Sequence, residues 1–389
     1  MNSKANTPHR GWHGPLLLVA VGVALAIPSS WSGAQDESNG KDVFRFDTFG
    51  DESFWTESLR MHEAIAQAVD PTTALSVGLK VDADALPPGI LKTADLKSPA
   101  TTVALLKLNA VVGLKGTVVS KDGKDTLTRV GVTCALCHST VDDSVMPGIG
   151  RRLDGWPNRS LNVGAIVALS PALDAAKKAV YSSWGPGKYD PRFNQDGKNM
   201  PVVIPPAFGL AGVRLATYTG DGDITYWNNY VAVTQMGGHG SFKEPRLGIA
   251  VEAKGQDLVK GKLPALREYQ HSLTTPPAAS GSYDAMAAKR GQTVFAGAAK
   301  CASCHSGKAF TDEKLHAPAE TGMDPSYATR SATKKYRATP LRALWQHPPY
   351  FHDGKAANLG AVVDHYDATL NLKLSAEQKK DLVEYLKSI

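Results

Sequence analysis

Cysteine is scarce in this chain of 389 residues, and all four cysteines lie within two short segments. Residues 134–138 and 301–305 both have the pattern Cys-x-x-Cys-His. A zinc site would need four ligands grouped at other spacings, and a thioredoxin-like redox pair does not need the following histidine. Because no cysteine remains outside the two segments, we expect no structural disulfide.

Long apolar runs are also few. The run Pro15–Pro28 is the most pronounced, and it is shorter than the roughly twenty residues of a membrane span. It follows the basic residues Lys4 and Arg10 and precedes Ser32-Gly33-Ala34, a small-x-small cleavage pattern. We therefore expect a signal peptide over residues 1–34, a periplasmic location and no membrane span after cleavage. The alternative is an uncleaved signal anchor.

The chain lacks a strong excess of charge of either sign. Its formal net charge is +6, which becomes +4 without the two basic residues of the expected signal peptide. Basic side chains do not gather into a stripe, so the sequence does not indicate a nucleic-acid partner. The apolar content of 42% is ordinary for a chain that buries a globular core.

The two cysteine segments carry the chemistry that is present. Cys-x-x-Cys-His is the attachment pattern of a c-type haem, because two thiols on one turn can form thioethers with the vinyl groups. The histidine that follows then becomes the proximal ligand of the iron. We assign one haem to Cys134, Cys137 and His138 and a second to Cys301, Cys304 and His305. Export agrees with this assignment, since c-type haem is attached outside the cytoplasm.

The patterning predicts a mainly α fold with two cytochrome c-type haem domains, long ordered loops and a small β-hairpin. We expect an N-terminal haem domain over residues 35–273, a linker over 274–283 and a C-terminal cytochrome c domain over 284–389. The linker is rich in Thr, Pro, Ala, Gly and Ser. The hairpin is expected around Lys121-Asp122-Gly123-Lys124, because Asp-Gly favours a tight turn.

Helices are predicted where apolar residues recur with helical spacing. The main ones are residues 52–69, 101–112, 172–182, 224–236, 258–273 with a break near Pro264, 284–297 and 375–387. Gly291 suits a close crossing between the first and last helices of the C-terminal domain, and Ser375 is the candidate N-cap of the last. The Pro-rich loop 185–209 is long enough to suggest that it lines a site.

The C-terminal part resembles the bacterial di-haem cytochrome c peroxidase and MauG-like superfamily. The resemblance covers about residues 285–389 and rests on Thr339–Arg342, Pro349–Gly354 and Cys301–Asp312. Further matching positions are Leu359, Val362 and Val363. It implies a helical cytochrome c fold whose haem transfers electrons. The N-terminal half departs from the pattern after its motif, at Ser139–Leu153, which leaves the peroxidase activity open.

The sixth iron ligand decides what each haem can do, because a vacant position can bind peroxide. For the C-terminal haem, the resemblance places a Met or Tyr on the helix after the His-Asp-Gly motif, which corresponds to Tyr366. Met323 is the rival, and His352 and His365 are weaker candidates.

For the N-terminal haem, Met236 follows an aromatic helix and precedes flexible glycines, which suits a thioether ligand. His239 and Met200 are alternatives. Calcium is a weak further candidate at Asp221-Gly222-Asp223. Arg151 and Arg152 are candidate partners of haem propionates.

These features predict an exported di-haem cytochrome that transfers electrons, with peroxide reduction as the attached chemistry. In the resembling peroxidases an aromatic side chain between the haems aids electron passage, and Trp227 is a candidate here. Small redox proteins would be the electron donors or acceptors. The alternatives are a plain di-haem electron carrier and a haem enzyme that oxidises an organic substrate.

Overall fold

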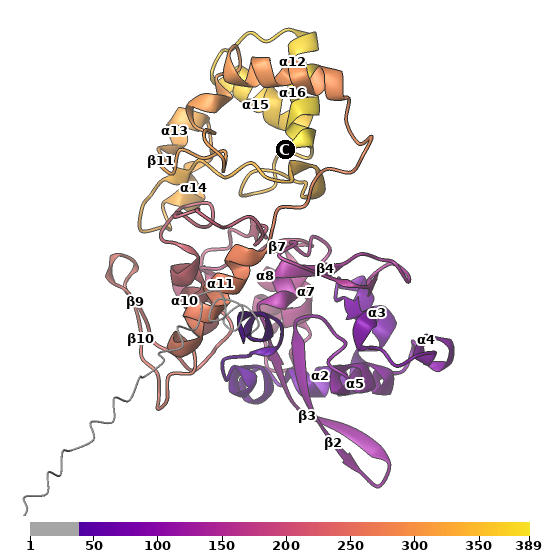
Figure 1. Ribbon diagram of the computed structural model, residues 1–389. Coiled ribbons are helices and arrows are strands. Elements are labelled where there is room, and N and C mark those ends of the chain that lie inside the picture. The colour runs from indigo at the N-terminus through magenta and orange to yellow at the C-terminus, as the bar shows by residue number, and fades with distance from the viewer. Residues whose placement is uncertain (1–38) are drawn as a thin grey trace, which may run out of the picture.

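The computed structural model describes residues 39–389 (Figure 1). The predicted signal peptide, residues 1–34, lies outside the described residues. The described chain is mainly helical, and its strands form six two-stranded sheets. The predicted mainly helical class with a small hairpin is therefore confirmed. No helix among residues 39–389 is both long and apolar enough to cross a membrane.

Short helices dominate the N-terminal part, which begins with a helical segment over residues 39–46. The α-helices that follow are α2 (Met61–Ala68), α3 (Pro71–Ser76), α4 (Ile90–Thr93), α5 (Pro99–Lys107), α6 (Ala135–His138), α7 (Val163–Ala168), α8 (Ala175–Ser182), α9 (Phe193–Asp196), α10 (Ile224–Thr234) and α11 (Leu263–Ser272). Other helical turns are the π-helical η1 (Ser53–Ser58) and the 3-10 turns η2 (Ala83–Ala85), η3 (Pro245–Leu247) and η4 (Lys260–Lys262).

The C-terminal part consists of α12 (Ala285–Ala296), η5 (Cys301–Ser303), α13 (Pro318–Thr321), α14 (Pro325–Ala328), η6 (Leu344–Gln346), α15 (Leu359–Thr369) and α16 (Ala376–Ser388). These helices gather at one end of the molecule, and an extended segment joins α11 to α12 (Figure 1).

Most of the paired strands are short, and all pairs but one are antiparallel. They are β1 (Val81–Asp82) with β5 (Ile149–Gly150), which is the parallel pair, β2 (Leu114–Lys121) with β3 (Lys124–Val132), β4 (Ser139–Val141) with β6 (Arg152–Asp154), β7 (Lys188–Tyr189) with β8 (Val202–Val203), β9 (Phe242–Glu244) with β10 (Ile249–Val251), and β11 (Leu315–His316) with β12 (Tyr336–Arg337).

The hairpin β2–β3 forms where the sequence predicts it and projects from the N-terminal part (Figure 1). Asp122 and Gly123 both have positive φ, 52° and 74°, as a type I′ turn requires. The arms are longer than predicted, because pairing continues to Leu114 and Val132. Strand β3 thus ends two residues before Cys134, so the hairpin positions the first cysteine segment.

Three apolar clusters hold the fold together. The largest lies in the N-terminal part and includes Phe44, Leu106 and Leu266, each fully buried. A second cluster lies in the C-terminal part around Phe295 and Leu382. The third joins Val202 from the N-terminal part to Tyr327, Ala328 and Tyr336 from the C-terminal part. Hydrophobic burial therefore contributes to both halves and to the contact between them.

The single helix predicted over residues 52–69 is wrong. The chain instead forms η1 and α2, separated at Arg60, whose φ is 55°. Tertiary hydrogen bonds explain the break. Trp55 Nε1 donates to the carbonyl of Met236 at 2.9 Å, and Thr56 Oγ1 donates to the carbonyl of Val130 at 3.1 Å.

Other predicted helices are shorter at one end. The helix predicted to reach residue 112 ends at Lys107, and the one predicted to reach Met236 ends at Thr234. Pro264 lies in the first turn of α11 and does not break it. This position costs no hydrogen bond, since the first N–H groups of a helix have no partner within it.

The crossing of α12 and α16 closes the C-terminal part. A Cβ atom built on Gly291 would lie 2.0 Å from the backbone oxygen of Asp381, so the two helices approach more closely than any larger residue allows. Ser375 caps α16, with its Oγ accepting from the N–H of Gln378 at 3.2 Å. Both predicted features are confirmed.

We expect Gly291→Ala to lower the free energy of unfolding by about 1–3 kcal/mol, because the added methyl group overpacks the crossing. Chemical denaturation followed by circular dichroism would measure the change. Gly261→Ala is the control, since nothing lies within 4 Å of its Cβ position. A Gly291→Ala protein as stable as the control would contradict the close crossing.

Candidate haem site

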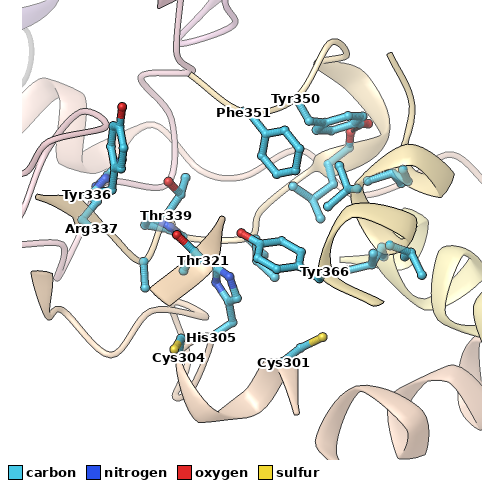
Figure 2. Close-up of a pocket in the computed structure, with 18 of the residues that line it drawn as sticks. Cys301, Cys304, His305, Thr321, Tyr336, Arg337, Thr339, Tyr350, Phe351 and Tyr366 are labelled. Carbon is cyan, nitrogen blue, oxygen red and sulfur yellow. Dashed lines mark hydrogen bonds between the residues drawn. The ribbon is translucent and has the colours of Figure 1, made fainter. Parts of the chain in front are cut away.

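The second cysteine segment forms one compact turn after α12. The N–H of His305 donates to the carbonyl of Cys301 at 2.9 Å, and that of Cys304 donates to the same carbonyl at 3.2 Å. Both thiols and the imidazole therefore project from a single turn, as Figure 2 shows. Burial raises the pKa of the Cys301 thiol to about 11.

A cavity of about 520 Å³ opens beside this turn (Figure 2). Its lining is predominantly apolar and includes Phe295, Leu344, Leu359, Val363, Leu382 and Leu386. Cofactor sites in proteins are clefts of about 300–1,000 Å³ with mainly apolar walls. The thiols of Cys301 and Cys304 and the imidazole of His305 all line the cavity. These residues fit a covalently attached haem c.

The imidazole of His305 is held in the tautomer that a metal ligand needs. Its Nδ1 lies 3.1 Å from the carbonyl oxygen of Phe310. A carbonyl only accepts hydrogen bonds, so Nδ1 carries the proton and Nε2 keeps its lone pair for a metal. Burial lowers the pKa of His305, which keeps the imidazole neutral.

His138 has the same arrangement at the first cysteine segment. Its Nδ1 lies 3.1 Å from the carbonyl oxygen of Pro205, so the Nε2 lone pair is again available. Burial lowers the pKa of His138 to about 4. The two cysteine segments differ in their surroundings, yet both histidines donate Nδ1–H to a backbone carbonyl. This shared geometry is what a pair of proximal ligands requires.

The thiols of the first segment lie deep in the N-terminal part. Burial raises the pKa of both Cys134 and Cys137 to about 12. Their side chains nevertheless keep some accessible surface, as does His138. A second haem attached at Cys134 and Cys137 remains a prediction.

Loops that follow the first segment wrap its turn. The N–H of Gly155 donates to the carbonyl of His138 at 2.8 Å, and that of Asn158 donates to the carbonyl of Cys137 at 2.9 Å. The carbonyl of Gly155 in turn accepts from Ala207 at 2.8 Å. These bonds tie two separate loops to the turn that carries the imidazole.

Tyr366 and Met323 both line the cavity that His305 borders. Figure 2 shows the ring of Tyr366 reaching from α15 into the pocket, close to the imidazole of His305. Burial raises the pKa of Tyr366 to about 12, and the nearby thiols of Cys301 and Cys304 act in the same direction. The structure therefore brings the predicted ligand Tyr366 and its rival to the same cavity as the proximal histidine.

The weaker histidine candidates have other contacts. His365 Nε2 lies 2.9 Å from the carbonyl of Thr321, to which it donates. His352 lines the cavity, but its ring is stacked between Tyr327 and Tyr336, with centroids 5.6 and 4.9 Å away. Both imidazoles are thus already engaged by the protein.

The three candidate ligands of the first haem differ in burial. Met236 is buried in the main core, against which Cys134 and Cys137 also pack. His239 is exposed, and Met200 packs against the cluster that joins the two parts. Met236 as the sixth ligand remains a prediction.

The calcium prediction is not supported by the contacts of Asp221. Its carboxylate accepts from Arg192 Nη2 at 2.6 Å and Thr219 Oγ1 at 2.8 Å. The N–H groups of Ala332 and Thr333 donate to it as well, at 2.8 and 3.2 Å. A guanidinium thus already neutralises this carboxylate. The other acid of the segment, Asp223, caps α10.

The predicted propionate partners Arg151 and Arg152 pair with acids of the chain. Arg151 Nε lies 3.2 Å from Asp142, and Arg152 Nε lies 3.0 Å from Asp82. The candidate inter-haem aromatic Trp227 packs between side chains of its own region. Its ring contacts that of Tyr230, with centroids 5.3 Å apart.

A different aromatic pair connects the loop around the first cysteine segment with η6. The rings of Trp156 and Trp345 meet edge to face, with centroids 5.8 Å apart. Trp156 belongs to the loop that bonds to Cys137 and His138. Trp345 directly follows Leu344, which lines the cavity at His305. The Gly-Trp-Pro sequence soon after the first segment could have indicated Trp156. Its partner Trp345 lies far along the chain, so the sequence did not indicate the contact.

Asp51 is a second residue that the sequence did not single out. Its side chain is fully buried and accepts from the N–H of Val132 at 3.2 and 3.3 Å. Burial raises the pKa of Asp51 to about 9, so the carboxyl group is protonated at neutral pH. The neighbouring acids Glu52 and Asp47 contribute to this shift, and Asp51 also raises the pKa of Cys134.

Comparison with known proteins finds relatives of part of this chain. Residues 288–389 match the cytochrome c family. The chain is 33% identical over 150 residues to the methylamine utilization protein MauG of Methylorubrum extorquens, covering 32% of this chain and 42% of the relative. It is 29% identical over 148 residues to the cytochrome-c peroxidase IdrP1 of a Pseudomonas species, covering 26% and 39%. The match thus spans about two fifths of these relatives.

Solved structures give weaker matches. A MauG-like protein associated with microbial copper homeostasis aligns at a TM-score of 0.27 and 19% identity, over 34% of this chain and 54% of that protein. Hydrazine synthase of Kuenenia stuttgartiensis aligns at 0.26 and 25% identity, over 33% and 55%. Together with the sequence relatives, the cytochrome c match supports haem c as the cofactor and a MauG and di-haem peroxidase-like family.

We expect Tyr366→Phe to alter the optical and EPR spectra of the oxidised haem at His305 and to raise its reduction potential. The reason is that loss of an oxygen ligand removes a group that stabilises oxidised iron. Met323→Leu is the matched control and should leave both properties unchanged. If the spectra change in Met323→Leu and not in Tyr366→Phe, the ligand is the methionine.

Proposed function

From its place in the MauG and di-haem peroxidase-like family, we propose that this chain is an exported di-haem c-type cytochrome that transfers electrons and reduces peroxide. The observation that carries the proposal is the cavity bordered by Cys301, Cys304 and His305, with Tyr366 reaching into it. When bound, haem c supplies one-electron transfer and, where the iron has an open position, a binding site for peroxide.

The two candidate sites would have different roles, electron entry at one and peroxide reduction at the other. The site at His305 has a protein side chain, Tyr366, available to close the iron, which suits a haem that only receives and passes electrons. Electrons would then enter at this site and pass to the site at His138. Peroxide reduction is assigned to the His138 site, because the resemblance gives the C-terminal haem the role of electron transfer.

Peroxide reduction consumes protons, and Asp51 is our candidate to supply one, because it contacts the strand that leads into Cys134. It is protonated at neutral pH, because burial raises its pKa to about 9. Its carboxyl group accepts from Val132, the last residue of the strand that leads into Cys134. A buried carboxylic acid with a raised pKa is a suitable general acid.

The Trp156–Trp345 contact offers the aromatic connection between the sites. Trp156 is held by the loop around Cys137, and Trp345 lies beside the His305 cavity. The ring centroids are 5.8 Å apart, so only van der Waals contact separates the two indoles. We therefore assign to this pair the role that the sequence suggested for Trp227.

A plain electron carrier is the second candidate, and the position of Met236 favours it. Met236 is buried in the core that Cys134 and Cys137 border. A thioether bound to the iron at His138 would close that haem to peroxide.

EPR spectra of the oxidised and half-reduced protein would decide between the two functions. We expect a high-spin or open iron in at least one of these redox states, together with turnover of hydrogen peroxide. Two low-spin irons in every state, and no turnover, would establish the carrier. Haem content measured by mass spectrometry is the control, because each function requires two attached haems.

Trp156→Phe should slow electron transfer between the two haems several-fold, since the smaller ring opens a gap toward Trp345. Rapid mixing with a one-electron reductant, followed at the absorbance bands of each haem, would measure the rate. Trp227→Phe is the matched control and should behave as the unaltered protein. A slow Trp227→Phe protein beside a normal Trp156→Phe protein would return the role to Trp227.

A further inference from the structure

Two arginines of the His305 cavity have N–H groups that no other side chain or backbone group satisfies within residues 39–389. Arg159 has its Nε and Nη1 without a partner, and Arg337 has its Nε without one. Both side chains line the cavity. Burying a guanidinium with unsatisfied N–H groups costs free energy unless an anion is bound beside it.

Residues 39–389 do not supply that anion at the cavity. Glu320 is the one acidic residue among those that line it. Its carboxylate already accepts from the N–H of Ala317 at 3.0 Å and lies 3.3 Å from His316 Nδ1. Burial lowers the pKa of Arg337 to about 10 and also lowers the pKa of Arg159. Among the described residues, the side chains that raise these two pKa values are tyrosines and not carboxylates. Within the described part of the chain, both guanidiniums therefore lack a carboxylate partner.

We propose that Arg159 and Arg337 form a carboxylate clamp for the propionates of the haem attached at Cys301 and Cys304. The proposal rests on the haem that the proposed function places in this cavity. Arg337 lies across the pocket from Cys301 in Figure 2. The vinyl groups are held at the thiols, and the propionates project from the part of the ring away from them. Guanidinium and carboxylate form strong, directional hydrogen bonds.

Neighbouring contacts hold the clamp in place. Arg337 Nη1 donates to the carbonyl of Leu215, and Arg159 Nη2 donates to the carbonyl of His347 at 3.0 Å. Tyr218 lies near both guanidiniums, and its hydroxyl donates to the carbonyl of Val203 at 2.9 Å. Each arginine thus has one N–H group fixed by the backbone, which leaves the remaining N–H groups for a ligand.

Arg159 belongs to the N-terminal part, so the clamp is completed across the two parts of the chain. The preceding residue, Asn158, donates its N–H to the carbonyl of Cys137 at 2.9 Å. Arg159 therefore borders the cavity at His305 and directly follows a residue that is bonded to the first cysteine segment.

This position gives Arg159 a predicted effect on both reduction potentials. A fixed positive charge stabilises reduced iron relative to oxidised iron, so its removal should lower the potential. Arg337 lies on the C-terminal side of the cavity, and its removal should act on the haem at His305 alone. Arg159 and Arg337 are positioning residues in this account, since they act on the irons through the propionates and through their charge.

Spectroelectrochemical titration of the holoprotein would test the proposal. For Arg159→Gln we expect both haems to become harder to reduce, by about tenfold in the equilibrium constant, or about 59 mV for one electron. Arg337→Gln should lower only the potential of the haem at His305. Arg159→Lys, which keeps the charge but not the fork of N–H groups, should give a smaller shift. Arg214→Gln is the control, because Arg214 is exposed and pairs with Glu313.

The proposal would be overturned if both haems of an Arg159→Gln protein with full haem content had the same reduction potentials as in the unaltered protein. If that variant does not mature, Arg159→Lys provides the test, and redox difference infrared spectra should show shifted propionate bands. Unchanged bands and potentials in Arg159→Lys would again count against the clamp. A protein with a single haem, at His305, would refute the di-haem function while leaving the Arg337 measurement decisive for the clamp.

Discussion

Both candidate iron ligands depend on a hydrogen bond from Nδ1 to a backbone carbonyl, but the two carbonyls come from very different places. Phe310 lies five residues after His305, so the C-terminal imidazole is fixed almost entirely by its own turn. Pro205 lies 67 residues after His138, so the first imidazole is fixed only when a distant loop is in position. A free ring would sample several orientations, and holding one in advance reduces the entropic cost of metal binding. The order of the Pro-rich loop is therefore a condition for the first site.

That loop also forms part of the second site. Pro205, Pro206 and Phe208 line the cavity beside Cys301 and His305, while the carbonyl of Pro205 holds His138. Proline limits the backbone freedom of the loop, which makes an ordered conformation less costly than it would be for other residues. One segment thus touches both candidate haem sites. The same relation explains why an orphan guanidinium, Arg159, and the indole of Trp156 come from the neighbouring loop, since these loops are tied together through Gly155 and Ala207.

The local parts of this architecture could be predicted from the sequence, and the non-local parts could not. The cysteine segments, the Asp122-Gly123 turn and the close approach at Gly291 each depend on residues adjacent in sequence or on one small side chain. The break at Arg60, the engagement of Asp221 by Arg192 and the Trp156–Trp345 contact depend on partners tens to hundreds of residues away. A pattern of apolar spacing carries no information about such partners. For the same reason Tyr366, on a helix within the matched family segment, was identifiable, whereas Asp51 was not.

The joint between the two parts must be rigid if electrons are to cross it, because the contact between Trp156 and Trp345 is lost if either side shifts. Buried ion pairs hold this joint. The side chains of Arg330 and Asp190 are both fully buried and lie 3.0 Å apart, and Arg330 also bonds to Asp196 at 2.7 Å. Such pairs contribute little net stability, since desolvation offsets most of the attraction, but a misplaced partner leaves an uncompensated buried charge. That free-energy cost makes every other relative orientation of the two parts less stable. Directional ion pairs therefore fix the distance between the sites more sharply than the apolar cluster around Tyr327 would alone.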